Sequence, residues 1–299
     1  MTHAKTKVFL DYDQEELDRA YNQRIWASNA DEVIGRYGAE SAAVRARLRF
    51  MADLAYGGTE DEVLDLFPTA RSSAPIHVFI HGGAWRLLSK NESCFAAPTF
   101  VEAGAHFVAL NFANIPQVRL PGMVAQVRRA IAWLYRNAGN LGGDPDRIYI
   151  SGHSSGAHLA AAALITDWPS QFGLPADLLK GGLCASGMYD LAPVMLSARG
   201  AYLKISALEE DALSPARQLH MVHCPVIVAY GENESPEFRR QALSFARSLD
   251  QISRLEDLVV CRGLNHFEVI ETLGVPDSPL ARAALRQMGL RQQVTRPLA

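Results

Sequence analysis

One pentapeptide constrains this chain more than any other segment, because it requires a strand, a sharp turn and a helix in immediate succession. Residues 152–156 read Gly-His-Ser-Ser-Gly. They follow the apolar run 147–151 and precede the alanine-rich run 157–164. Glycines on both sides of a serine let strand and helix pack closely, while the backbone between them holds the serine strained and exposed. The pattern predicts that Ser154 is a nucleophile.

The rest of the chain supplies a fold for this turn. From about residue 60 onward, short apolar runs alternate with helical patterns, which is typical of a mostly parallel, twisted sheet flanked by helices. Together with the serine turn, this alternation predicts an α/β-hydrolase fold. Strands are expected at 62–67, 76–80, 106–111, 147–151, 182–186, 225–230 and 258–261, and helices at 123–137, 155–166, 236–249 and 279–288.

The first 58 residues differ in character from the rest. They carry helical patterns at 14–25 and 40–54 and no obvious strand. We therefore divide the chain into a helical N-terminal extension, residues 1–58, packed on the main domain, and an α/β-hydrolase catalytic domain, residues 59–299. The extension either overhangs the site as part of a lid or serves only as scaffold, and the sequence leaves both open.

Composition limits the classes of binding partner that we expect for this chain. The formal net charge is only −3 with no block of like charges, so we expect a small-molecule substrate rather than nucleic acid or an anionic membrane. No run of 18 apolar residues occurs, and the N-terminus does not read as a secretory signal, so a cytoplasmic location is expected. The four cysteines lie far apart without metal-ligand or redox spacing, which predicts buried free thiols and no metal. The oligomeric state stays open, a homodimer included.

Chain order selects a general base for Ser154. A serine hydroxyl needs a base, usually histidine, and the histidine needs an orienting acid. In α/β-hydrolases these residues follow the order serine, acid, histidine. Of the histidines after Ser154, His158 lies on the same helix, and His220 and His223 precede a strand. His266 follows the last strand in a predicted loop and is our choice of base.

The acid is expected after the penultimate strand. The segment 231–237 offers three glutamates there. Glu237 fits the first turn of a helix capped by Ser235, so we assign it a structural role. Glu234 lies just outside that helix and is our choice of acid, with Glu232 next. Asp190, after the preceding strand, is the positional alternative.

A glycine pair after another strand completes the site. Residues 81–85 read His-Gly-Gly-Ala-Trp, and loops of this type supply backbone amides to an oxyanion hole. We expect the amides of Gly83, Ala84 and Ser155 to form the hole, where one donor contributes about 3 kcal/mol. Gly82 is expected to shape the turn.

At this point the residues resemble the kynurenine formamidase (arylformamidase) branch of the α/β-hydrolases. The matching segments are 18–24, 65–68, 81–85, 152–156, 186–191 and 234–241, which span nearly the whole chain. The last is the most specific, because family members carry an acid followed by Ser-Pro-Glu-Phe at the acid position. Glu234 stands where the family more often has aspartate, and Ser155 where alanine or another small residue is common. Residues 111–116 also depart from the usual pattern.

The resemblance implies hydrolysis of an N-formyl-arylamine, such as N-formylkynurenine, to formate and the free amine through an acyl-enzyme on Ser154. It requires no cofactor. Gly82, Trp85, Tyr189 and Phe267 are candidate substrate-binding residues, the aromatic ones forming either a wall for a planar substrate or part of the core. A carboxylesterase acting on short-chain or aryl esters needs the same machinery and is the alternative. A non-catalytic ligand-binding homologue is a minor alternative.

Overall fold

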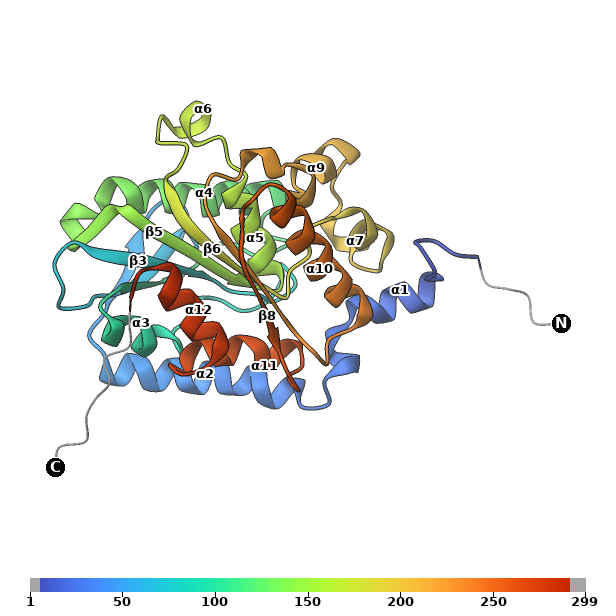
Figure 1. Ribbon diagram of the computed structural model, residues 1–299, viewed down its shortest axis with the longest axis horizontal. Helices are drawn as coiled ribbons and strands as arrows, with labels where there is room; N and C mark the ends of the chain where they lie inside the picture. The colour runs from blue at the N-terminus through green and yellow to red at the C-terminus, as the bar shows by residue number, and fades with distance from the viewer. Residues whose placement is uncertain (1–5, 291–299) are drawn as a thin grey trace.

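An eight-stranded sheet organises the computed structural model, which describes residues 6–290 (Figure 1). The first five residues, part of the expected non-signal N-terminus, lie outside the described residues. The strand order is β1-β2-β4-β3-β5-β6-β7-β8, with β2 antiparallel to β1 and β4 and every other pair parallel. The strands are β1 Met51–Ala55, β2 Val63–Phe67, β3 Ala74–Ile80, β4 His106–Leu110, β5 Gly143–His153, β6 Leu179–Ala185, β7 Val226–Gly231 and β8 Leu255–Cys261. This arrangement confirms the predicted α/β-hydrolase fold.

Helices cover both faces of the sheet (Figure 1). Helices α2, α3, α11 and α12 contribute to one hydrophobic cluster, and α4, α5 and α10 to the cluster on the opposite face. The helices are α1 Gln14–Tyr21, α2 Ala30–Arg47, α3 Ala97–Ala103, α4 Leu120–Asn137, α5 Ser155–Leu164, α6 Trp168–Phe172, α7 Ala192–Leu196, α8 Gly200–Leu203, α9 Ala207–Ala212, α10 Pro236–Gln251, α11 His266–Glu271 and α12 Pro279–Gln287. The sheet is thus the middle layer of three.

Strand β3 shows why the sheet could be predicted. All seven of its residues are buried. Ile76, Val78 and Ile80 belong to one hydrophobic cluster and Phe79 to the other, because successive side chains of a strand point to opposite faces. An interior parallel strand is buried on both faces, so its sequence reads as one continuous apolar run. All seven predicted strands are present.

The strand register brings distant loops together at the carboxyl edge of the sheet. Ile80 at the end of β3 is the partner of Gly152 near the end of β5. His153 is the partner of Ala185 at the end of β6. Gly231, which ends β7, is the partner of Cys261, which ends β8. The loops that follow these strands must therefore meet at one place, which is where ligands bind in open α/β sheets.

The structure differs from three predictions for the N-terminal segment. Residues 1–58 were expected to lack a strand, but Met51–Ala55 forms β1, antiparallel to β2. The helix expected at 40–54 is α2, Ala30–Arg47, and the helix expected at 14–25 stops at Tyr21, before the 3₁₀ turn Gln23–Trp26. β1 lies at the edge of the sheet, and none of its residues is fully buried. Its short sequence therefore lacks the alternation of apolar and polar residues that would indicate a strand.

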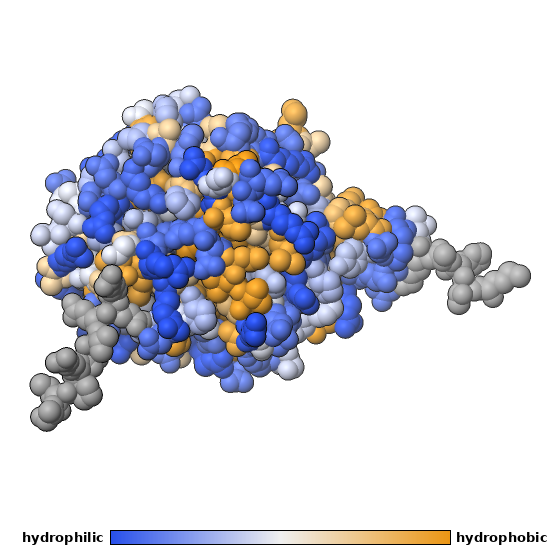
Figure 2. All heavy atoms as spheres, in the orientation of Figure 1, coloured by the Kyte–Doolittle hydropathy of each residue, from blue (hydrophilic) through white to orange (hydrophobic). Residues whose placement is uncertain are grey.

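The surface is mostly polar, with apolar residues gathered near the centre of the face in Figure 2. The edge strand β8 lies in this central region in Figure 1, and its Val260 is exposed. None of the described helices is both long and apolar enough to cross a membrane.

Candidate active site

Ser154 occupies a strained turn between β5 and α5. Its backbone has φ 56° and ψ −121°, a conformation that costs a non-glycine residue about 1–3 kcal/mol. The two glycines allow the close approach, because a Cβ on Gly152 would lie 2.2 Å from the carbonyl oxygen of Gly156, and a Cβ on Gly156 would lie 2.2 Å from that of Ile80. The sheet and α5 therefore hold Ser154 in place through contacts that leave no room for larger residues.

Three side chains from separate strand ends form a chain of contacts. The hydroxyl of Ser154 donates to Nε2 of His266 at 3.0 Å. The Nδ1 of His266 lies 3.4 Å from Oε2 of Glu234. All three residues are buried. The arrangement can move a proton from Ser154 to His266 while a carboxylate faces the far side of the imidazole.

Glu234 is held by its other oxygen. Oε1 accepts a hydrogen bond from the Ser186 hydroxyl at 2.5 Å and from the Gly231 amide at 2.7 Å. Ser186 follows β6 and has φ 56°. Sequence reasoning missed Ser186, although its place after a strand adjacent to β7 was a usable signal. These two anchors fix the carboxylate, so Oε2 alone is directed at His266.

The alternative acids lie elsewhere. Glu232 is exposed and accepts from the amide of Gly263. Asp190 pairs with Arg217 at 2.8 Å. Glu237 is fully buried but bonds Tyr21 and Arg240. The structure therefore brings Glu234, and neither predicted alternative, to the histidine.

His266 begins a helix rather than lying in the predicted loop. It is the first residue of α11, and the preceding Asn265 caps that helix by accepting from the amides of Phe267 and Glu268. The carbonyl of His266 also accepts a hydrogen bond from Nε2 of His153 at 2.8 Å. Burial, together with the nearby His266, lowers the pKa of His153 well below its usual value. A neutral His153 adds no charge beside the imidazole that must accept the proton.

The loop after β3 faces the serine turn. Gly83, Ala84 and Trp85 have φ values of 105°, 55° and 60°. The amide of Trp85 donates to the Ser155 hydroxyl at 3.1 Å. Within residues 6–290, no hydrogen-bond partner is found for the amides of Gly83, Ala84 or Ser155. Free amides beside the nucleophile are what an oxyanion hole requires, and the Ser155 hydroxyl ties the strained loop to α5.

Two of the predicted aromatic wall residues belong to the core instead. Trp85 is 1% exposed, and its Nε1 donates to Nδ1 of His158 at 3.3 Å. Tyr189 is fully buried, stacks on Phe245 and donates to the carbonyl of Cys184. Both side chains are satisfied within the interior and do not line the cavity beside Ser154, which favours the core reading that the sequence left open.

Gly82 does not line that cavity either. A Cβ there would lie 2.9 Å from the carbonyl of His153 and 3.2 Å from Cβ of Ser154. Its role is to let the loop after β3 approach the serine turn. This fits the predicted role of Gly82 in the turn, whereas the lining of the cavity gives it no contact with substrate. Of the four predicted substrate-binding residues, only Phe267 lines the cavity.

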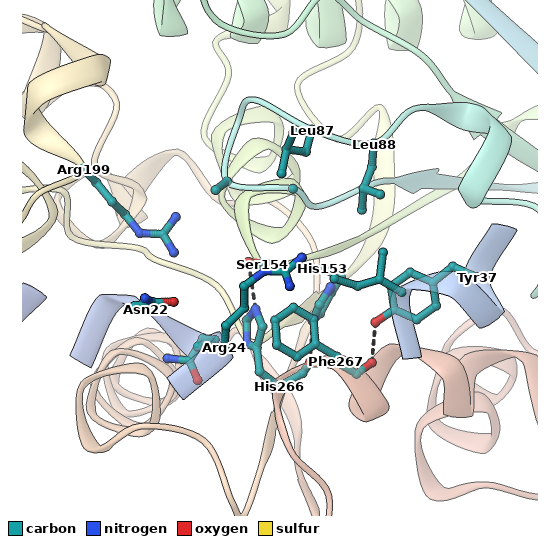
Figure 3. Close-up of a pocket in the computed structure, with 14 residues that line it drawn as sticks. Asn22, Arg24, Tyr37, Leu87, Leu88, His153, Ser154, Arg199, His266 and Phe267 are labelled. Carbon is teal, nitrogen blue, oxygen red and sulfur yellow. Dashed lines mark hydrogen bonds between the residues drawn. The ribbon is translucent and has the colours of Figure 1, made fainter. Parts of the chain in front are cut away.

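A cavity of about 210 Å³ opens beside the nucleophile (Figure 3). The sheet domain contributes Ser154, His266, Phe267, Leu87 and Leu88, with Gly83, Ala84, His153 and Arg199. The N-terminal segment contributes Asn22, Gln23, Arg24, Ile34 and Tyr37. The extension thus forms one wall of the cavity.

Several hydrogen bonds hold this wall in place. Tyr37 donates its hydroxyl to the carbonyl of Phe267. The side-chain amide of Gln23 donates to the Ser235 hydroxyl at 2.7 Å, directly after Glu234. Sequence reasoning did not name the wall residues, because no local pattern shows which side chains of an added helix face a distant site. Among residues 6–290, no group of three or more metal-ligating side chains comes together.

Comparison with known proteins shows the family of this chain. A family model described as BD-FAE matches residues 64–173. Kynurenine formamidase of Salmo salar is 34% identical over 297 residues, covering 93% of this chain and 98% of that protein. Kynurenine formamidase of Danio rerio is 34% identical over 291 residues, covering 92% and 97%. The chain belongs to the kynurenine formamidase family.

A solved structure extends the comparison to three dimensions. The crystal structure of a Silicibacter protein described as a thioesterase matches with a TM-score of 0.79 and 26% identity, covering 89% of this chain and 98% of that one. Membership of the kynurenine formamidase family confirms the resemblance inferred from the sequence.

Proposed function

We propose that this protein is a serine hydrolase that cleaves an N-formyl-arylamine of the N-formylkynurenine type to formate and the free arylamine. The observation that carries the proposal is the chain Ser154–His266–Glu234 beside free loop amides, in a member of the kynurenine formamidase family. An amide is a demanding substrate, because its leaving nitrogen must be protonated as the C–N bond breaks. A histidine that first accepts and then returns the serine proton meets that demand.

The reaction proceeds in two halves. Ser154 Oγ attacks the formyl carbon as its proton passes to Nε2 of His266, and the amides of Gly83, Ala84 and Ser155 bind the oxyanion. Collapse of this intermediate breaks the C–N bond, and His266 gives its proton to the leaving amine. Water then attacks the formyl-serine ester, again losing its proton to His266, and formate leaves as His266 returns that proton to Ser154 Oγ. Glu234 keeps Nδ1 protonated and stabilises the imidazolium in both halves.

The cavity suits an aromatic amine. Phe267, Leu88 and Ile34 provide apolar surface close to the nucleophile. Burial of one aromatic ring removes roughly 150–250 Å² from water, so such a surface contributes substantially to binding. Small formyl groups need no acyl pocket of their own.

The proposal is tested by the release of formate. Purified protein is incubated with N-formylkynurenine, and formate and kynurenine are measured against a matched reaction with Ser154→Ala. Equimolar formate and amine, absent with Ser154→Ala, support the function. A formamide rate at background, with hydrolysis of aryl acetates by the same preparation, would refute it in favour of the carboxylesterase alternative.

One observation keeps ester cleavage as the second candidate function. The structurally similar Silicibacter protein is described as a thioesterase, and esters need the same nucleophile and oxyanion hole. The ratio of formamide to aryl acetate hydrolysis therefore decides the class of substrate.

We also propose a cytoplasmic location and a small-molecule substrate. The four cysteines, Cys94, Cys184, Cys224 and Cys261, are buried and unpaired, which suits a reducing compartment. A homodimer stays a prediction, and size-exclusion chromatography with light scattering tests it.

A further inference from the structure

The cavity beside Ser154 has two chemically different sides (Figure 3). Phe267 and Tyr37 lie on one side. On the other, Arg199 points its guanidinium toward the space in front of Ser154 and His266, with Asn22 below it in this view. A ligand whose reacting carbonyl sits at Ser154 thus meets aromatic surface in one direction and a cation in the other.

Arg199 is anchored without being neutralised. Its Nε and Nη2 donate to the carbonyl of Tyr21 at 3.2 and 2.6 Å, and Nη1 lies 3.5 Å from the Tyr202 hydroxyl. Both acceptors are uncharged. No carboxylate within the described chain lies in ion-pair distance of this half-buried guanidinium. Since arginine carries five N–H groups, one N–H on each terminal nitrogen is left for a ligand.

The other arginine of the cavity is in a different state. Arg24 forms an ion pair with Asp31, and about half of its side chain is exposed. Its charge is therefore already compensated and screened by water. Arg199 is the cavity cation with charge and donors to spare.

We propose that Arg199 binds a carboxylate on the substrate, so that the enzyme selects aromatic substrates whose side chain carries a carboxylate group. This inference rests on the proposed function and specifies its substrate class. A free N–H on each of Nη1 and Nη2 matches the two oxygens of a carboxylate, the paired geometry in which arginine binds carboxylates most strongly. The anchor at Tyr21 fixes the guanidinium before the substrate arrives, so little further ordering is required.

The test compares two substrates that differ only in charge. N-formylkynurenine and its carboxamide, in which the carboxylate is a neutral amide, are assayed for kcat/KM. Wild-type protein should prefer the acid, and Arg199→Gln should lower the acid-to-carboxamide ratio about 30-fold, the loss expected for a hydrogen-bonded charge pair. Arg199→Lys should retain part of the preference. A ratio is insensitive to any general damage that the substitution does to folding.

A matched control removes a nearby positive charge outside the cavity. Arg86 packs its guanidinium over the ring of Tyr202, so Arg86→Gln should leave the ratio within about twofold. Equal ratios in the wild type and Arg199→Gln would overturn the proposal, as would loss of the preference in Arg24→Gln alone.

A second pair separates this inference from the proposed function. An aryl acetate bearing a carboxylate on a short side chain is compared with its carboxamide in the same proteins. An Arg199-dependent preference among acetates, with no formamide hydrolysis, would reject the formamidase function and keep the anion site. Formamide hydrolysis without an Arg199-dependent preference would support the formamidase function and reject the anion site.

Discussion

Two regions of the molecule meet at the cavity, and they are built differently. The carboxyl ends of the parallel strands supply Ser154, Glu234 and His266 through the register of a rigid sheet. The N-terminal segment supplies Tyr37 and its neighbours from helices packed on that sheet. The first region is interior and continuous, whereas the second packs on it through apolar side chains such as Val33 and Tyr37 and through side-chain hydrogen bonds.

We therefore expect the strand ends to carry out the reaction and the extension to influence which substrate is bound. Substitutions at the strand ends should lower the rate on every substrate, because they remove groups that act on the reacting carbonyl. Substitutions in the extension should alter stability or substrate preference and leave the acyl-transfer chemistry in place. Each prediction below tests that division.

Ser154→Ala should have the largest effect. Loss of the attacking oxygen should lower kcat by about 10⁴- to 10⁶-fold on formamides and esters alike. Thermal unfolding should stay close to wild type, because the strained turn is held by backbone contacts. Ser72→Ala, in an exposed turn before β3, is the matched control and should be fully active. Residual activity near wild type would remove Ser154 from the mechanism.

Glu234→Gln comes next, with a kcat loss of about 10³- to 10⁴-fold. Two donors hold Oε1, so the new amide nitrogen must face Nδ1 of His266. A donor at that position favours the tautomer with the proton on Nε2, which cannot accept the proton of Ser154.

Glu232→Gln is the matched control, since Glu232 is exposed and bonds only the Gly263 amide among the described residues. Its kcat should stay within about twofold of wild type. A larger loss of kcat from Glu232→Gln or Asp190→Asn than from Glu234→Gln would identify that residue as the acid that orients His266.

The strand-end region was also the one that the sequence could predict. Buried parallel strands read as apolar runs, and the residues after them carry the chemistry, so local pattern and chain order lead to Ser154 and His266. Ser186 was missed because its one signal, a position after a strand adjacent to β7, does not show which residue its hydroxyl contacts. For Trp85 and Tyr189 the sequence left both readings open, because an aromatic residue beside a motif looks the same whether it faces the core or a cavity.

The extension could not be predicted to the same depth. β1 is a short edge strand without alternation, so its segment was taken for a helix. The residues that line the cavity, Tyr37 and Arg24 among them, reach it through long-range packing that no local signal encodes. The position of Arg199 could not be predicted either, because its anchor on the Tyr21 carbonyl joins residues far apart in the chain.

Acid should lower the stability of the fold through buried histidines of the sheet domain. Burial lowers the pKa of His81 and His158 to about 4 and that of His77 to about 3, whereas the described part of the extension contains no histidine. Unfolded histidine has a pKa of about 6.5, so between pH 6.5 and 4 the unfolded chain binds protons that the native state excludes. Stability therefore falls as the pH drops through this window.

The size of this effect can be measured residue by residue. A histidine shifted to about 4 should reduce the free energy of unfolding by about 2 kcal/mol between pH 7 and pH 5. Urea unfolding at pH 7, 6 and 5 measures the total loss in the free energy of unfolding. His158→Gln should remove the part due to this histidine. The fold should tolerate the change, because Gln can still accept from Trp85 and donate to Leu213. The same pH slope in that variant would contradict a neutral His158.

Ser155→Ala should lower kcat about tenfold with KM little changed. The substitution leaves the buried Trp85 amide without its acceptor and loosens the strained loop that carries the Gly83 and Ala84 amides. Steady-state kinetics on a neutral aryl acetate isolates the effect on the oxyanion. Ser155→Thr keeps the hydroxyl and should restore part of kcat, whereas equal rates in all three proteins would show that this bond does not position the loop.

Tyr21→Phe should have the smallest effect and should spare the chemistry. The buried hydroxyl donates to Glu237 at 2.9 Å and accepts from Gln241 at 3.2 Å, so its loss should lower the free energy of unfolding by about 1 kcal/mol. The kcat on a neutral aryl acetate should stay near wild type, because Glu234 and His266 are untouched. Tyr135→Phe, on a partly buried tyrosine of α4, is the control in urea unfolding. A kcat loss matching that of Ser155→Ala would show that the extension also supports catalysis.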